Sequence, residues 1–118
     1  MSEHVIYVDR FTLREGSLEE FKSYATAMAE FVEENEPEVL SFNYYVDQDG
    51  AGGTAVFVFS DAVALDLHLD LASSRFQEGL ELLSATEIEV LGRPSERAAE
   101  LAKSFGAALK TKLAGFNR

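Results

Sequence analysis

The chain has 118 residues, 47% of them hydrophobic and 26% charged, which suits one folded domain with its own core and argues against disorder. Its formal net charge of −11 at pH 7 argues against nucleic-acid binding, because phosphates would be repelled. The absence of cysteine excludes disulfides, thiolate nucleophiles and cysteine-ligated metals.

The apolar runs of the sequence bear on secretion and on membrane insertion. The N-terminal residues lack a basic region followed by a long apolar stretch, so no signal peptide is expected. No apolar run approaches the roughly 20 residues of a membrane-spanning helix. We therefore expect a cytoplasmic protein that does not enter a membrane.

The first elements are a strand and an amphipathic helix. Residues 5–13 are rich in β-branched and aromatic types and predict a strand. Ser17 and Glu20 have the spacing of a capping box, which predicts a helix start. The apolar residues that follow recur at spacings of three and four and end before Pro37. They are Leu18, Phe21, Ala25, Met28 and Val32.

A hairpin is predicted next. Along residues 40–46, one strand face is expected to carry Leu40, Phe42, Tyr44 and Val46. A glycine-rich turn at 47–53 leads into residues 54–59, a strand that is apolar on both sides. Such a strand must be covered twice, by helices on one face and by something else on the other. We therefore expect a homodimer formed through the open sheet face.

The second half continues with a helix, a strand and a last helix. Asp61 is the expected cap of a helix carrying Ala62, Leu65, Leu69 and Ala72, with a restart at Ser73 or Ser74 toward Leu83. Residues 86–91 alternate as a strand. Ser95 is the expected cap of a final amphipathic helix with the stripe Leu101, Phe105, Leu109, Leu113 and Phe116.

This order, β-α-β-β-α-β, predicts an α+β, ferredoxin-like fold with an antiparallel sheet. Residues 1–92 would form the ferredoxin-like domain. Residues 93–118 would add a C-terminal amphipathic helix that packs on the same domain or on its dimer partner.

Three residues are candidates for chemistry. His68, midway along an apolar helix, has the imidazole of a general base, although a lone histidine is also compatible with a structural or surface position. Asp9 shares a strand face with apolar residues, which suggests either a pocket-lining carboxylate or a paired or edge charge. Tyr44 either offers its hydroxyl to a ligand or belongs to the core.

The sequence gives no support for a metal or phosphate site. The chain has two histidines, His4 and His68, and His4 lies near the terminus. Residues 47–50 resemble the start of a calcium loop, but Val58 occupies the position of the required glutamate. The glycines at 50–53 lead into a strand, which does not suit a phosphate cradle, and no G-x-S-x-G motif occurs.

Several loose motifs make the chain resemble the antibiotic biosynthesis monooxygenase-like family of dimeric α/β-barrel proteins. They are the F-T-L-R-E-G-S segment after the first strand, Glu36-Pro37 followed by Leu40 and Phe42, and Asp61-x-x-Ala64 followed by His68 and Phe76. The resemblance covers residues 5–92. It implies oxygenation of a small electron-rich aromatic substrate with O₂ and no cofactor, with His68 as the base, Tyr44 as a hydrogen-bonding group and Asp9 as an orienting group or second acid.

The haem-degrading branch of that family has an asparagine, a tryptophan and a haem-ligating histidine where this chain has Asp9, His68 and Leu80. The resemblance therefore does not extend to haem degradation. Two functions remain open: a cofactor-independent monooxygenase, and a non-catalytic ligand-binding or structural dimer of the same fold. The first predicts His68 facing a cavity within reach of Tyr44 or Asp9. The second predicts His68 packed shut or exposed, with no cavity.

Overall fold

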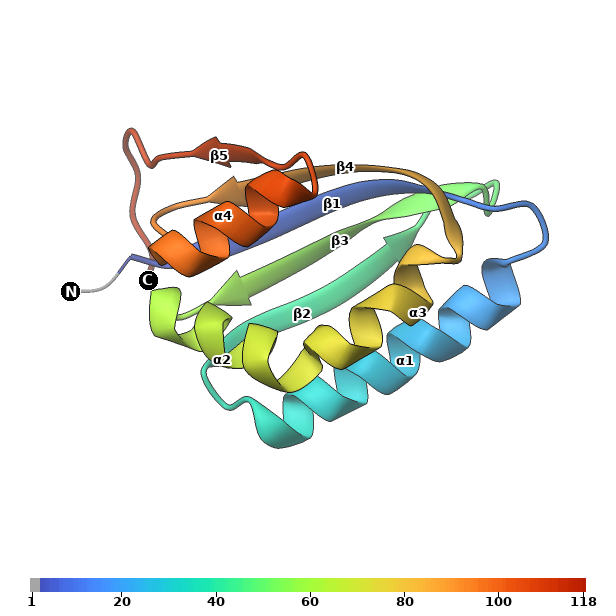
Figure 1. Cartoon of the computed structure of the whole chain (residues 1–118), viewed down its shortest axis with the longest axis horizontal. Helices are drawn as coiled ribbons and strands as arrows, with labels where there is room; N and C mark the ends of the chain where they lie inside the picture. The colour runs from blue at the N-terminus through green and yellow to red at the C-terminus, as the bar shows by residue number, and fades with distance from the viewer. Residues whose placement is uncertain (1–2) are drawn as a thin grey trace.

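The computed structural model, which describes residues 3–118, contains one five-stranded sheet with its helices gathered on one face (Figure 1). The strand order is β2-β3-β1-β4-β5. All neighbouring strands are antiparallel except the β4–β5 pair, which is parallel. The strands are β1 (Val5–Leu13), β2 (Val39–Val46), β3 (Gly52–Phe59), β4 (Leu83–Leu91) and β5 (Ala108–Lys110). The sheet is open at both edges.

The helices are α1 (Leu18–Asn35), α2 (Ala62–Ala72), α3 (Phe76–Leu80) and α4 (Glu96–Ser104), with a 3₁₀ turn, η1 (Ser73–Arg75), between α2 and α3. Up to β4, this order confirms the predicted ferredoxin-like arrangement. Two predicted caps are also confirmed. The backbone N–H of Ala64 donates to Asp61 Oδ1 at 2.9 Å, and that of Ala98 donates to Ser95 Oγ at 3.1 Å. Among the described residues, no helix is long and apolar enough to cross a membrane.

Alternation along β1 and β3 separates a helix-covered face from an open face. The odd-numbered residues of β3 are buried under the helices, and Phe59 is completely buried. Val8, Val56 and Val58 point to the other face and are only half-buried. Strand β3 is therefore apolar on both sides over residues 55–59, as predicted.

The predicted capping box at Ser17 is wrong, because Ser17 makes no side-chain cap hydrogen bond. Its backbone has φ −96° and ψ 0°, whereas a capping serine needs an extended conformation. The predicted face of β2 is also partly wrong. An irregularity between Val39 and Ser41 displaces Leu40, which is exposed, while Phe42 and Tyr44 keep the expected inward face.

The predicted C-terminal helix is much shorter than its apolar stripe. Helix α4 ends at Ser104, and Gly106, with φ +79°, turns the chain toward β5. Leu101, at the end of α4, borders the helix-covered side of the sheet. Leu113 and Phe116 follow β5 and are exposed, so the apolar periodicity beyond α4 does not belong to a helix.

Gly53→Ala is expected to destabilise the β2–β3 hairpin strongly. An added Cβ would lie 2.0 Å from the carbonyl oxygen of Tyr45, and backbone atoms cannot move away as a flexible side chain would. We expect a loss of about 2–4 kcal/mol in unfolding free energy, measured by urea denaturation. Thr54→Ala, at the next residue of β3, is the control, and an equal loss in both variants would contradict the steric explanation.

Candidate active site

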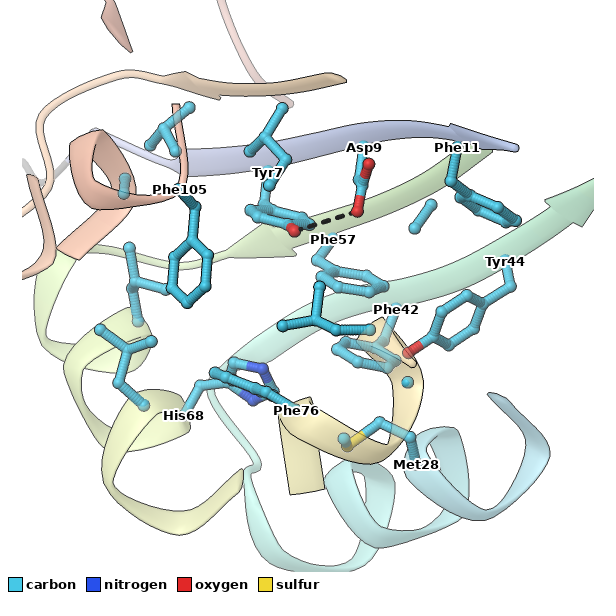
Figure 2. A pocket seen from close by; sticks show the side chains of 18 of the residues that line it. Tyr7, Asp9, Phe11, Met28, Phe42, Tyr44, Phe57, His68, Phe76 and Phe105 are labelled. Atoms are coloured by element: carbon cyan, nitrogen blue, oxygen red, sulfur yellow. Dashed lines mark hydrogen bonds between the residues drawn. The ribbon is translucent and has the colours of Figure 1, made fainter. Parts of the chain in front are cut away.

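An apolar cavity of about 160 Å³ lies between the sheet and the helices (Figure 2). Strands β1 to β4 supply its floor, and α1, α2, α3 and α4 supply its remaining walls. A dry apolar cavity of roughly 150 Å³ is large enough to hold a benzene ring. Aromatic side chains dominate the lining and include Phe21, Phe42, Phe57, Phe59, Phe76 and Phe105.

His68 lies on α2 and forms part of the cavity wall, where its side chain is almost fully buried. Its ring packs against Phe42, Phe59 and Phe76, with ring centroids 5.4–5.7 Å apart. His68 Nδ1 lies 2.9 Å from Glu36 Oε1. The ring has no other hydrogen bond among the described residues, so Nε2 is the nitrogen available to a molecule in the cavity.

Glu36, which was not among the residues predicted from the sequence, is the partner of His68. It is the C-cap residue of α1 and is only 2% exposed. Its second carboxyl oxygen, Oε2, is buried without a hydrogen-bond partner in residues 3–118. One signal was present in the sequence. Glu36 lies four residues after Val32 and so continues the buried stripe of α1.

Burial shifts the two pKa values in opposite directions. It raises the pKa of Glu36 to about 7, because the carboxylate is desolvated, and lowers the pKa of His68 to about 4, because the imidazolium is desolvated. Above a pH of about 7, Glu36 is ionised and His68 is neutral. The carboxylate then accepts the Nδ1 proton, which leaves an unprotonated Nε2 as the potential base.

Asp9 points from β1 into the same cavity and is only 8% exposed, so of the two positions left open by the sequence it occupies the pocket-lining one. The hydroxyl of Tyr7 donates to Asp9 Oδ2 at 3.3 Å, and the hydroxyl of Thr86 donates to Oδ1. Burial raises the pKa of Asp9, and these two hydrogen bonds offset part of that effect. Tyr7 was not predicted as the partner of Asp9, although the two residues share a strand face.

Tyr44, on β2, also lines the cavity. Its ring meets the edges of Phe42 and Phe57 at centroid distances of 5.6 and 5.4 Å. Burial raises the pKa of Tyr44, so its hydroxyl stays protonated and can donate to a ligand.

The three residues predicted from the sequence thus line one cavity, and no hydrogen bond joins them directly. Figure 2 shows Asp9 and His68 on different walls, with Phe57 and Phe42 between them. The Phe42 and Phe57 rings are stacked, with centroids 3.7 Å apart. In residues 3–118, no three His, Asp or Glu side chains are grouped closely enough to hold a metal ion. The arrangement places the Tyr7–Asp9 pair and the Glu36–His68 pair on different walls of one aromatic cavity.

Comparison with known proteins gives matches in structure only; no protein-family model and no curated protein sequence matches the chain. The crystal structure of MupZ from Pseudomonas fluorescens is 26% identical, with a TM-score of 0.80. That match covers 99% of this chain and 96% of MupZ, so it includes the region after β4.

Two further solved structures match mainly the ferredoxin-like part. SnoaB, a cofactor-independent oxygenase from Streptomyces nogalater, is 21% identical over 80% of this chain and 96% of its own, with a TM-score of 0.66. A proposed antibiotic biosynthesis monooxygenase from Caulobacter crescentus CB15 is 17% identical over 80% of this chain and 92% of its own, with a TM-score of 0.69. These matches confirm the predicted family resemblance at the level of the fold.

Proposed function

We propose that this chain, which shares its fold with antibiotic biosynthesis monooxygenase-like proteins, oxygenates a small electron-rich aromatic molecule with O₂ and without a cofactor. The observation that carries the proposal is the buried Glu36–His68 pair on the wall of an aromatic cavity. A histidine with a purely structural role would be expected to pack without an adjoining cavity.

The suggested chemistry begins with proton removal. His68 Nε2 takes the proton of a phenol or activated C–H group, and the resulting anion transfers an electron to O₂. A carbon–oxygen bond then forms between substrate and oxygen, and loss of water leaves a new carbonyl group. The dry aromatic walls favour a flat, uncharged substrate. Tyr44 would donate a hydrogen bond to the developing oxyanion, and Asp9 would orient the substrate.

The test is oxygen consumption with a panel of phenols and hydroquinones under air. We expect at least one compound to be oxidised at a rate that saturates with its concentration. His68→Gln should lower that rate about 100-fold, the usual size of a general-base contribution. Asp70→Asn is the matched surface control, because Asp70 is exposed and pairs with the likewise exposed Arg97.

Oxygen uptake that is equal in the wild type and His68→Gln would contradict the proposed role of His68. Binding of aromatic compounds without any oxygen uptake would instead support the second function considered from the sequence, a non-catalytic ligand-binding dimer of the same fold. Thermal-shift measurements with the same panel distinguish binding from turnover.

The open face of the sheet supports a second part of the proposal, a homodimer. Val8, Val56 and Val58 form an apolar strip on this face, and a second copy of the chain presents the same strip, as a two-fold interface requires. Val56→Lys would place a charge at the centre of the strip.

We expect the wild-type chain to sediment as a dimer and Val56→Lys to sediment as a monomer in analytical ultracentrifugation. Val63→Lys, the same substitution at an exposed position of α2, should remain dimeric. A monomeric wild-type chain would contradict this part of the proposal and leave the active-site proposal untouched.

A further inference from the structure

We propose that the same cavity catalyses proton transfer on an apolar cyclic ketone in the absence of O₂, with Asp9 as the acid and His68 as the base. The inference rests on the proposed function for one point, the use of His68 as a base. It requires neither oxygen nor electron transfer, so it can hold or fail separately.

The acid end of the cavity is built around a carboxyl group without a counterion. Arg10, the neighbour of Asp9, points to the opposite sheet face and pairs with Glu89 at 3.2 Å. Among the described residues, Asp9 forms no ion pair and receives only the Tyr7 and Thr86 hydroxyl donors. An apolar cavity favours the uncharged carboxylic acid, which can donate its proton to a ligand oxygen.

Tyr7 and Thr86 fix the direction of this donor. Each of the two hydroxyls holds one carboxyl oxygen, so the side chain of Asp9 cannot rotate freely. Tyr7 is fixed in turn by stacking on Phe57, with ring centroids 5.2 Å apart and planes within 6°. Burial also raises the pKa of Tyr7, so its hydroxyl remains a donor and does not compete as an anion. Such positioning is what a general acid needs.

The base end is the His68–Glu36 pair, which reaches the cavity from α2 and the end of α1. Acid and base therefore come from different elements and approach a bound molecule from different walls (Figure 2). The rings of Phe42 and Phe57 stack directly on each other, with centroids 3.7 Å apart, and both line the cavity. A flat molecule would lie against these rings, with its oxygen near Asp9 and its acidic C–H bond near His68.

The reaction balances without any other reactant. His68 Nε2 takes a proton from the carbon next to a carbonyl group, and the C–H electrons form a C=C bond. The carbonyl oxygen takes the proton of Asp9 as its π electrons move onto it, which gives an enol. Returning a proton to the same or a conjugated carbon, and the O–H proton to Asp9, restores both residues. The net result is isomerisation or hydrogen exchange, with no change in oxidation state.

The cavity also limits the class of substrate. Its aromatic walls and its size select an uncharged ketone with one or two rings. A carboxylate substrate would meet unfavourable desolvation and the negative charge of the protein.

The test uses the full chain, 2-tetralone as the probe, D₂O as the solvent and argon as the atmosphere. Proton NMR follows the exchange of the hydrogens next to the carbonyl group. We expect saturable exchange, with kcat/KM lowered about 100-fold by Asp9→Asn and by His68→Gln. Asp70→Asn, the matched surface control, should behave as the wild type.

If Asp9→Asn does not fold, two variants that leave Asp9 in place still test its role. Tyr7→Phe and Thr86→Val each remove one hydroxyl that holds Asp9, and each should lower kcat by about tenfold while leaving KM within about twofold. The inference would be overturned if the wild type exchanged hydrogens no faster than His68→Gln. It would also be overturned if no change at Asp9, Tyr7 or Thr86 altered the exchange rate.

The outcomes also separate the two proposals. Exchange under argon without oxygen uptake under air would contradict the oxygenase and support this inference. Oxygen uptake that depends on His68, without exchange of 2-tetralone, would contradict this inference alone.

Discussion

His68→Phe and Glu36→Gln are expected to have stabilities that depend on pH with opposite slopes. In His68→Phe, the remaining Glu36 has a pKa raised from 4.5 to about 7 by burial. The folded state then keeps a proton that the unfolded state releases, and stability falls by about 3 kcal/mol as pH rises from 4.5 to 7. In Glu36→Gln, the remaining His68 has a pKa lowered from 6.5 to about 4. Stability then falls by about 3 kcal/mol as pH falls from 6.5 to 4.

In the wild type these two slopes cancel between about pH 4.5 and pH 6.5. The unfolded state carries one proton on His68, and the folded state carries one proton on Glu36, so unfolding changes no proton count at this pair. Urea unfolding of the three proteins at several pH values measures the effect. Subtracting the unfolding free energy of the wild type from that of each variant removes the contribution of the other ionisable groups. If the difference in unfolding free energy between each variant and the wild type did not change with pH, the pair would not be desolvated.

The rate of proton removal by His68 is expected to rise about 100-fold between pH 5 and pH 8. While Glu36 is protonated, its O–H donates to Nδ1 and the imidazole proton lies on Nε2, where no lone pair remains for catalysis. Ionisation of Glu36, with its pKa of about 7, reverses this arrangement and frees Nε2. The measurement is kcat/KM against pH with the oxidised phenol, whose proposed reaction does not need a protonated Asp9.

Glu36→Gln is the decisive variant for this profile. Its amide does not ionise and can either donate to Nδ1 or accept from it, so nothing switches the tautomer of His68 near pH 7. We therefore expect kcat/KM of Glu36→Gln to show no rise near pH 7. A rise near pH 7 that persists in Glu36→Gln would assign the titration to another group.

The features predicted correctly from the sequence depend on local pattern. Alternation along β1 places Asp9 under the helices, and the spacing of three and four identifies the buried face of α1. Asp61 lies directly before an apolar helical stretch, so its role as a cap could be predicted from its neighbours. His68 could be selected because an imidazole among leucines on an apolar helix is unusual.

The features that were missed depend on distant parts of the chain. Glu36 is 32 residues from His68 and follows two glutamates and an asparagine, so it resembles the solvated end of a helix. Its burial is visible only when α1 and α2 are placed side by side. The end of α4 was misjudged for a different reason: apolar spacing continues past Gly106, although the backbone does not remain helical.

Glu36 directly follows the last residue of α1, so the length of that helix determines where the carboxylate lies relative to His68. Each residue added to or removed from α1 turns its end by about 100° and moves it by about 1.5 Å. A single insertion or deletion between Val32 and Glu36 would therefore separate the carboxylate from the imidazole without altering either side chain. Homologues that differ by one residue in this segment would retain the fold and the histidine but lose the carboxylate that makes the histidine a base. The length of this helix is therefore a criterion for recognising inactive homologues.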